Sequence, residues 1–366
     1  MPKEYQYFNQ TRTYSFFQNL LPEESLFRSI AKRKRFAYDN VFDALKVLGK
    51  ECAGAIIITY DSEIINDNQY ENCTSEILEE LQKENCCLAL LPKANTSLAG
   101  AQDKIAVYIK DDNFYFPKNY APTSHILKPS NIFFQDLVYN ESFCLNLARN
   151  MGLSACENKI YTFDNCSSIL CITRYDRENN QRLHQEDFCQ CIGLYRSAKY
   201  QADSNWHGIR AVRECAEDLN LDIRKNLLDF MLFSYFIGNN DGHLKNLSVL
   251  YNIDCTASFA PFYDLLSTEV YKIVSLEMAI AFGMHYFKSE VTRSDLFALS
   301  SDLDLSIDEI DLILAEYFEK LPIALKKTKE SFNNIEIIDK ISKIVTDSIL
   351  SAKKTLCEHN IYHIPS

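Results

Sequence analysis

Glycine is scarce in this chain, with nine residues among 366, and tryptophan occurs only once. Long apolar runs are missing too: a membrane-spanning helix needs roughly 20 apolar residues, and the longest run here, residues 227–238, has the length of a buried helix. The N-terminal stretch MPKEYQYFNQTRTYS is polar and lacks the apolar segment of a secretory signal. We therefore expect a cytoplasmic protein without a membrane segment.

Paired cysteines are absent as well. None of the thirteen cysteines forms a C-x-x-C pair, and their number is odd. Cys86 and Cys87 are adjacent, and Cys189 and Cys191 flank one residue, so neither pair has the spacing of a zinc ribbon. The cysteines stand mostly in apolar contexts, which is typical of free thiols that serve as small apolar side chains in a reducing cytosol.

Positive charge is in deficit, because 38 Lys and Arg face 50 Asp and Glu, which gives a formal net charge of −12. Such a balance disfavours broad, non-specific binding of nucleic acid by this chain itself, although it fits contact with a basic partner. The hydrophobic content of 47% and charged content of 24% are those of a soluble globular protein. A chain of this length exceeds one ordinary core, so we expect two or more lobes.

The first quarter of the chain is predicted to be mainly helical. Residues 14–50 read as helices, and AGAIIITY (53–60), apolar and β-branched, reads as a strand. Residues 61–75 are polar and rich in Asn, which predicts a loop. Ser75 is the expected N-cap of the short amphipathic helix that follows in SEILEELQKEN.

The pattern then changes to a mixed α+β middle and a helical C-terminal part. Short alternating runs between residues 96 and 128 predict an antiparallel sheet with tight turns. Residues 140–153 predict a helix capped by Asn140 and ended by Gly152. Further helical patterns, and one strand at 246–252, follow in the last part: 208–219, 222–238, 306–320 and 335–357.

Two of the nine glycines stand in FIGNNDGHLKN, a dense polar cluster that directly follows the apolar run LLDFMLFSYF. In this cluster Asp241 precedes Asn246 by five residues, and Asp264 follows 18 residues after Asn246. Upstream, TSLAGAQDK (96–104) is a loop of small residues that opens a strand, and Lys128 ends the strand in HILKPS.

These are the parts that phosphoryl transfer needs, in the order in which protein kinases carry them. A loop of small residues lets backbone N–H groups approach phosphates, and a lysine from a strand neutralises their charge. An aspartate accepts the proton of the attacking hydroxyl, while an asparagine and a second aspartate hold Mg²⁺. The interval from Asp241 to Asn246 is that of the kinase catalytic loop, and FYD, which ends at Asp264, stands in place of D-F-G.

Each residue taken alone has an ordinary structural explanation that is the better one. Gly100 could mark a simple turn, Lys128 a solvated strand end, Asp241 a cap within a loop, and Asp264 the N-cap of a helix in LLSTEV. The kinase interpretation rests on all of them together, in chain order, with the sheet first and the helices after.

The same segments resemble the HipA-like serine/threonine kinase toxins. The similarity covers the chain from about residue 14 to the end and is carried by SLAGAQDK, PTSHILKPS, NESFCLNLARNMGL, TRYDR, RLHQEDFCQCIGL, FIGNNDGHLKN and APFYDLLS. It implies an α+β fold, a two-lobed protein-kinase-like domain with a small, partly truncated N-terminal subdomain. The implied boundaries are 1–92 for this subdomain, 93–178 for the kinase N-lobe and 179–366 for the helical C-lobe.

Matched position by position, the resemblance implies a role for each motif residue. Asp241 matches the catalytic base, and Asn246 and Asp264 match the Mg²⁺ ligands. Ser97 matches the serine that family members autophosphorylate, with Thr96 as a neighbouring alternative. The implied ATP contacts are the loop residues Ala99, Gly100, Ala101, Gln102, Asp103 and Lys104, then Lys128, the hinge residues Thr173, Arg174 and Tyr175, and finally His243, Leu244, Lys245, Asn246, Tyr263 and Asp264.

The resemblance also implies a biological setting. It implies an ATP- and Mg²⁺-dependent kinase that is the toxin of a toxin–antitoxin pair, with an aminoacyl-tRNA synthetase as the target. The implied partner is a HipB-like helix-turn-helix antitoxin, which binds DNA, so this chain itself would contact no nucleic acid. Because the chain begins almost at FFQNLLPEESL, a small HipS-like protein is expected to supply the missing N-terminal strands, or these strands are lost.

Two other classes of function stay open at this point. One is a binding module, a kinase fold without catalysis, against which the complete set of Lys128, Asp241, Asn246 and Asp264 speaks. The other is a kinase of small molecules, against which the family-specific stretch RLHQEDFCQ speaks.

Overall fold

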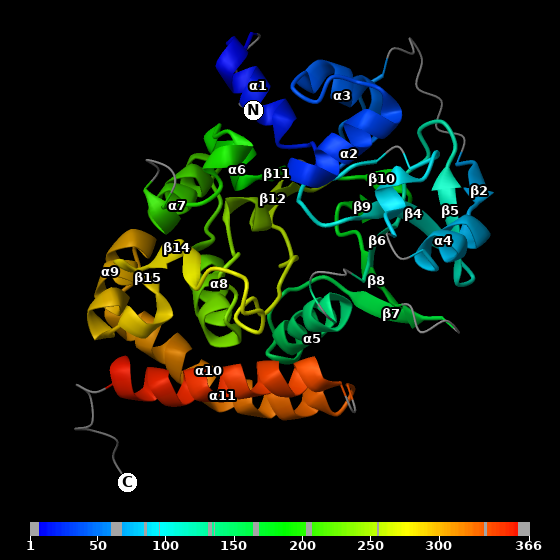
Figure 1. Ribbon diagram of the computed structural model, residues 1–366. Helices are drawn as coiled ribbons and strands as arrows, with labels where there is room; N and C mark the ends of the chain where they lie inside the picture. The colour runs from blue at the N-terminus through cyan, green and yellow to red at the C-terminus, as the bar shows by residue number, and fades with distance from the viewer. Residues whose placement is uncertain are drawn as a thin grey trace. The chain divides into compact units, whose positions relative to one another are not determined.

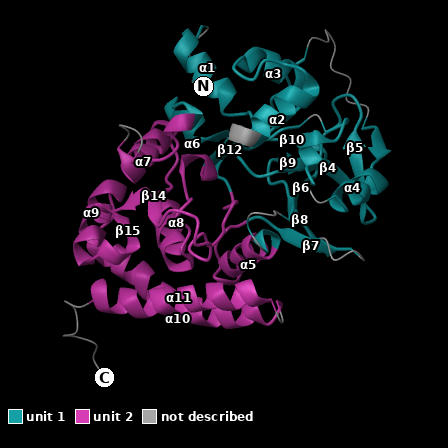
Figure 2. Ribbon diagram, viewed as in Figure 1, with its two compact units in different colours: residues 1–138, 156–196, 248–260 teal, residues 139–155, 197–247, 261–366 magenta. Residues whose placement is uncertain are grey.

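The computed structural model describes residues 7–59, 68–83, 86–94, 96–130, 134, 136–163, 168–202, 207–254, 256–332 and 335–357. The chain forms two compact units, each built from three segments (Figure 2). Unit 1 consists of residues 1–138, 156–196 and 248–260, and unit 2 of residues 139–155, 197–247 and 261–366. The three-part division expected from the sequence stays a prediction.

The centre of unit 1 is a six-stranded sheet in which every strand pairs antiparallel with its neighbours. Its strand order is β2 (Tyr70–Asn72), β5 (Asn113–Pro117), β4 (Ile105–Lys110), β6 (His125–Pro129), β8 (Ser168–Thr173) and β7 (Asn158–Thr162). Asp111 and Asp112 join β4 to β5 with φ values of 50° and 55°, a left-handed conformation that Asp tolerates in tight hairpins. The antiparallel sheet predicted between residues 96 and 128 is thus present.

Helices from the N-terminal part of the chain belong to the same unit (Figure 1). They are α1 (Gln10–Gln18), α2 (Glu24–Lys34), α3 (Val41–Leu48), α4 (Thr74–Leu81) and the short 3₁₀ helix η1 (Leu88–Leu90). The side chains of Asn9 and Asn40 cap α1 and α3 by accepting backbone N–H groups. Phe27 and Ile77 of the helices pack with Phe114 of the sheet in one apolar core.

Two small sheets and a hairpin complete unit 1. The strand β1 (Glu51–Cys52) runs parallel to β3 (Thr96–Ser97), and β9 (Arg177–Glu178) pairs with β10 (Gln181–Arg182). A three-stranded sheet contains β11 (His184–Asp187), β12 (Ser248–Tyr251) and β13 (Ala257–Phe259). The helix α6 (Phe188–Ile192) begins with a capping box between Asp187 and Gln190.

Unit 2 is mainly helical, as the sequence predicted for the C-terminal part. Its helices are α5 (Leu137–Asn150, from residue 139 on), α7 (Gly208–Asp218), α8 (Arg224–Ile237), α9 (Arg293–Leu303), α10 (Ile307–Lys329) and α11 (Glu336–Thr355). The last two lie side by side (Figure 1). Shorter elements are η3 (Leu244–Asn246), the hairpin of β14 (Glu277–Phe282) and β15 (His285–Phe287), and η4 (Lys288–Glu290).

Several local predictions are wrong. The strand expected over residues 53–60 is absent in its described part, because the chain turns at Gly54, which has a φ of 74°; residue 60 lies outside the described residues. The loop expected over 61–75 contains β2 and the start of α4, and its residues 61–67 lie outside the described part. Ser75 is not an N-cap, because α4 already begins at Thr74.

The helix α5 shows one prediction that failed and one that holds. Asn140 is not its N-cap, because α5 begins three residues earlier and the Asn140 side chain bonds to the distant residue Ser267. Gly152, with a φ of 87°, does end the helix, and the N–H of Leu153 returns to the carbonyl of Ala148.

Among the described residues, none of the helices has both the length and the apolar character needed to cross a membrane.

Candidate active site

In unit 2, the polar cluster directly follows the apolar helix α8. The helix ends at Gly238, whose φ of 69° turns the backbone in the left-handed region, and whose N–H bonds to the carbonyl of Ser234. A Cβ on Gly238 would lie 2.7 Å from the carboxyl carbon of Glu269. Glycine suits this position, because it adopts the left-handed angle without strain and any larger residue would require the Glu269 side chain to move.

Backbone bonds then close the loop so that Asp241 and Asn246 meet. The N–H of His243 donates to the Asp241 carbonyl at 2.9 Å, and the N–H of Asn246 donates to the His243 carbonyl at 2.9 Å. The side-chain amide nitrogen of Asn246 donates to the same Asp241 carbonyl at 3.2 Å. That bond sets the orientation of the amide and directs its nitrogen to the protein, so the oxygen is the atom left for a cation.

The Asp241 carboxylate is half-buried and receives a hydrogen bond from Tyr200 at 2.7 Å. The Tyr200 ring also meets the His243 ring edge-on, with centroids 5.3 Å apart. Burial, together with the positive charges of Lys199 and Lys245, holds the pKa of His243 well below its usual value. His243 is therefore neutral at physiological pH and adds no positive charge beside Asp241.

The segment that carries Asp264 is tied to this loop within unit 2. The Tyr263 hydroxyl donates to the carbonyl of Lys245 at 2.6 Å, one residue before Asn246. Asp264 itself has a φ of 56°, and its charge acts on His243. It is not the N-cap of a helix, because no helix follows it in the described residues before η4. The structure thus removes the N-cap alternative for Asp264, which favours the kinase interpretation.

Asn140 of α5 holds the segment just after Asp264. Its amide accepts the N–H of Ser267 at 2.8 Å and donates to the Ser267 carbonyl at 2.8 Å, and the residue is fully buried. A buried amide that makes a bidentate bond to the backbone restricts where the segment can lie. Asn140 therefore fixes the path that brings Asp264 toward His243.

These side chains suit a magnesium ion that is shared with a nucleotide. Mg²⁺ prefers oxygen ligands and is commonly held by one or two carboxylates together with phosphate oxygens. The amide oxygen of Asn246 and the carboxylate of Asp264 are donors of that kind. No cluster of three or more His, Cys, Asp or Glu in the described part could hold a metal by protein ligands alone. The donor set fits Mg²⁺ with phosphate and does not fit a structural zinc.

In unit 1, Lys128 lies in the middle of the sheet. It stands on β6 opposite Leu170 of β8, and it is 4% exposed. It is therefore not the solvated strand end that the sequence allowed as an alternative. A lysine held on a central strand of the sheet is the arrangement in which protein kinases carry the lysine that neutralises phosphates.

The loop of small residues is anchored at both ends in unit 1. Gly100 has a φ of 108°, and its carbonyl accepts the N–H of Glu23 at 3.1 Å. The Lys104 ammonium group donates to the Ala99 carbonyl at 2.9 Å. Asp103 accepts the N–H groups at the start of η1, and burial raises the pKa of its carboxyl group. The Asp103 carboxylate is thus engaged inside the protein, so any contact of Asp103 with phosphate would come from its backbone.

The three predicted hinge residues differ in what they can offer a nucleotide. Thr173 ends β8 and is exposed, whereas the Arg174 side chain is buried in ion pairs. The N–H groups of both residues already donate, to the carbonyls of Glu157 and Ser124 respectively. The ring of Tyr175 packs against an apolar cluster, and its hydroxyl bonds to Gln185. Arg174 could therefore contact ATP only through its carbonyl oxygen.

Sequence reasoning missed two residues of this site in unit 2. Tyr200 stands 41 positions before Asp241, and Asn140 stands 127 positions before Ser267. No local spacing could have indicated either contact, because each pair meets only after the helices of unit 2 have packed.

Taken together, the fold is α+β, and unit 2 carries a closed loop in which Asp241 and Asn246 have the interval of the kinase catalytic loop. Comparison with known proteins identifies the group. Residues 96–325 match the HipA-like C-terminal domain, and residues 1–59 match the HipA N-terminal domain. The chain therefore belongs to the HipA-like family of serine/threonine kinases, which confirms the class of protein indicated by its motifs.

Individual relatives agree with this assignment. The chain is 32% identical over 312 residues to Y4mE of Sinorhizobium fredii, a protein named as a candidate kinase; the match covers 80% of this chain and 73% of Y4mE. It is 24% identical over 333 residues to the serine/threonine-protein kinase toxin HipA of Shewanella oneidensis, covering 85% and 76%.

A solved structure supports the fold. A chain of the Shewanella oneidensis MR-1 complex of HipA, HipB and operator DNA matches 97% of this chain and 89% of its own length, with a TM-score of 0.83 at 20% identity. The predicted α+β fold of the HipA kind is thus confirmed.

Proposed function

We propose that this protein is an ATP- and Mg²⁺-dependent serine/threonine protein kinase. The observation that carries the proposal is the arrangement in unit 2, where one loop joins Asp241 to Asn246 and the Tyr263–Lys245 bond ties the Asp264 segment to that loop. A catalytic aspartate next to two oxygen donors for Mg²⁺ is what phosphoryl transfer to a hydroxyl requires.

Each residue has a defined task in this reaction. Asp241 accepts the proton of the attacking hydroxyl, and Asn246 and Asp264 would hold Mg²⁺, which when bound neutralises charge on the phosphate oxygens. In unit 1, Lys128 neutralises the phosphates, and the loop at 99–104 offers backbone N–H groups to them. Thr173 and Tyr175 border the adenine.

The biological role proposed is that of a toxin in a toxin–antitoxin pair. A relative is named as a kinase toxin, and the structural neighbour is a complex of HipA with HipB and operator DNA. We expect a HipB-like helix-turn-helix antitoxin as the partner, and the net charge of −12 of this chain fits contact with a basic protein. The HipS-like protein and the aminoacyl-tRNA synthetase substrate stay predictions from the family resemblance.

The experiment that tests the function compares phosphoproteomes. Cells that express the wild type should contain phosphoserine or phosphothreonine sites that are missing from cells with Asp241→Asn, and a translation component should be among them. Equal phosphoproteomes would contradict the proposed kinase activity, provided that the wild type and the variant are both folded and present at equal levels.

Tyr200 is expected to keep the Asp241 carboxylate oriented and ionised. A hydrogen bond to a carboxylate favours its charged form. In the Tyr200→Phe variant this bond is lost, so Asp241 should become ionised only at a higher pH. The acidic limb of the kcat/KM profile should therefore move to higher pH. Above that limb the rate should fall by less than about tenfold, because the carboxylate itself remains.

The matched control for this prediction is Tyr317→Phe. Tyr317 is a buried tyrosine of unit 2 whose hydroxyl donates to the backbone carbonyl of Asp229. Loss of the Tyr317 hydroxyl should lower the stability of the protein and leave the pH dependence of kcat/KM unchanged. Identical profiles for Tyr200→Phe and the wild type would show that Tyr200 does not act on the base.

Ser97 is the proposed site of autophosphorylation, and the structure adds a condition. The residue is fully buried, and its hydroxyl donates to the Leu20 carbonyl at 2.8 Å. The γ-phosphoryl group can pass from ATP to Ser97 Oγ, with loss of the hydroxyl proton and release of ADP, only after β3 leaves this position. If β3 returned to this position, the added charge of roughly −1.5 to −2 at neutral pH would face the Leu20 carbonyl oxygen. We therefore expect modification to displace the loop and switch the kinase off.

Peptide mapping after incubation with ATP and Mg²⁺ tests this expectation. Phosphate should appear on Ser97, and the phosphorylated chain should bind ATP weakly and be cut more readily by protease between residues 96 and 104. Thr96→Ala is the control for the neighbouring hydroxyl. An active wild type without phosphate at Ser97 or Thr96 would contradict the site, and full ATP affinity of the phosphorylated chain would contradict the switch.

A further inference from the structure

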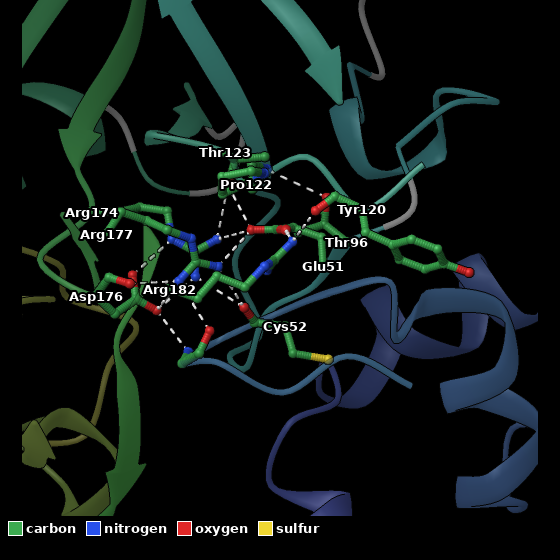
Figure 3. A network of polar contacts seen from close by, with 12 residues as sticks. Glu51, Cys52, Thr96, Tyr120, Pro122, Thr123, Arg174, Asp176, Arg177 and Arg182 are labelled. Carbon is green, nitrogen blue, oxygen red and sulfur yellow. Dashed lines mark hydrogen bonds and ion pairs between the residues drawn. The ribbon is translucent and has the colours of Figure 1, made fainter. Parts of the chain in front are cut away.

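A buried network of ion pairs in unit 1 joins three arginines to two carboxylates (Figure 3). The exposed fractions of the side chains are 1% for Arg174, 4% for Arg177, 9% for Arg182, 4% for Glu51 and 5% for Asp176. Charged groups are rarely buried to this degree unless their partners are fixed in place. The network is therefore a rigid point of this unit.

Glu51 is the residue that contacts all three guanidinium groups. Its Oε1 accepts from Arg174 and Arg177 at 2.7 Å each and from the hydroxyl of Thr123 at 2.7 Å, and its Oε2 pairs with Arg182. Figure 3 shows these side chains converging on the Glu51 carboxylate. Burial alone would raise the pKa of Glu51, but the three guanidinium groups outweigh it and hold the pKa below its usual value.

Asp176 pairs with two of these arginines, Arg174 and Arg177. It accepts from Arg174 Nε at 2.9 Å and Arg174 Nη2 at 2.7 Å, and it accepts the backbone N–H of Gly54 at 2.7 Å. Gly54 cannot be replaced without strain, because its φ is 74° and a Cβ would lie 2.8 Å from the nitrogen of Gln185. Residues 51–54 are thus connected to the Arg174–Asp176 segment through side chains and backbone alike.

The network joins the two segments of unit 1 that are proposed to bind the nucleotide. Arg174 is the middle residue of the hinge at 173–175, so its position in the network sets the backbone on both sides of it. Glu51 lies on β1 and pairs with Thr96 of β3, which leads directly into the loop at 99–104. The Glu51 carboxylate therefore contacts the hinge at Arg174, and the strand that carries Glu51 pairs with the strand that leads into the loop at 99–104.

We infer that Glu51 is a positioning residue for nucleotide binding, which fixes the hinge at 173–175 relative to the loop at 99–104. The inference rests on the proposed kinase function. It makes the segment 51–54, which carries none of the kinase motifs, a necessary part of the nucleotide site. Glu51 itself does not contact the nucleotide. It acts through Arg174 and through the β1–β3 pairing.

A purely structural role for the network predicts a different result. If the ion pairs only hold unit 1 together, removing one of them lowers stability and leaves the affinity of the remaining folded protein for ATP unchanged. If Glu51 positions the two segments, ATP affinity falls even where the variant is fully folded, because a nucleotide must contact both segments at once. Affinity and stability therefore have to be measured separately.

The test is titration calorimetry of the full chain with ATP and Mg²⁺, at a temperature where circular dichroism shows every variant folded. Glu51→Gln keeps the shape of the side chain but leaves three guanidinium groups with one carboxylate. We expect its ATP affinity to fall by about tenfold or more. Hydrogen exchange at the amides of residues 173–176 should be faster than in the wild type.

Two further variants make the outcome decisive. Thr123→Val removes the hydroxyl that donates to Glu51 and accepts from Arg174, and it keeps every charge, so it should fold even where Glu51→Gln does not. Its affinity should fall by about threefold. Asp295→Asn is the matched control: it is a fully buried acid of unit 2, bonded to His285, and should lose stability without loss of ATP affinity.

The possible results separate the two proposals. Wild-type affinity in folded Glu51→Gln, or in Thr123→Val where Glu51→Gln does not fold, would overturn the positioning role and leave the kinase standing. A wild type that does not bind ATP at all would overturn the nucleotide site itself. An equal loss of affinity in Asp295→Asn would show that any buried ion pair has this effect, and would also overturn the inference.

Discussion

The Asp241→Asn variant is expected to keep the wild-type fold and to lose phosphoryl transfer by about 10²- to 10⁴-fold, the contribution of a general base. Asn has nearly the same shape, and its amide oxygen can still accept the hydrogen bond of Tyr200. The bonds that close the loop use the Asp241 carbonyl, which the substitution keeps. Only the proton acceptor is removed.

This result is measured as transfer of phosphate to a protein substrate, or to Ser97, under saturating ATP and Mg²⁺. Asp229→Asn is the control, because it makes the same chemical change at a buried aspartate of α8 that bonds to Lys225 and Tyr317. It should retain transfer. Near wild-type transfer in Asp241→Asn would place the base elsewhere, and an unfolded variant would show that Asp241 is structural. Growth inhibition, if the protein is a toxin, should disappear together with transfer.

The second large effect is expected at Asp264, where loss of the carboxylate should remove the dependence of ATP binding on Mg²⁺. Loss of a residue that only orients a metal ligand commonly costs about 10- to 100-fold in metal affinity, and loss of a ligand itself should cost at least as much. In the presence of Mg²⁺, the affinity of Asp264→Asn for ATP should therefore fall to about the level seen without the ion. Without Mg²⁺, variant and wild type should bind ATP equally.

Asn is the informative substitution at this position because the backbone of Asp264 has a φ of 56°. Asn tolerates the left-handed region, whereas Ala would add strain and confuse a metal effect with a folding effect. Asp304→Asn is the matched control, since Asp304 has a φ of 51° and caps α9 with the same conformation. ATP affinity that is unchanged in Asp264→Asn, with and without Mg²⁺, would contradict the metal-ligand role.

Local sequence signals predicted the parts of this fold that depend on neighbours along the chain. The helix end at Gly152 was predicted because it is formed by residues a few positions apart. The antiparallel strands at 105–117 were readable from alternation and from a turn of two aspartates. The interval from Asp241 to Asn246 belongs to the same class, because a single loop closes over it.

Predictions failed where a distant residue decided the local structure. The segment after Cys52 has the composition of a strand, but the Gly54 N–H bonds to Asp176 and the chain turns. Asn140 has the sequence signature of an N-cap, but its amide bonds to Ser267 inside unit 2. In both cases a buried polar group found a partner far away in the sequence, and that bond outweighed local propensity.

The sequence by itself determined the α+β class, the family and the set of residues with the chemistry of phosphoryl transfer, because these depend on residue types, intervals and order along the chain. Only the tertiary structure decided how those residues are held. It placed Tyr200 on Asp241, Asn140 on the segment after Asp264, and the Arg174 side chain among buried carboxylates. The physical reason is that buried polar and charged groups must be paired, and their partners come from whichever segments packing brings together.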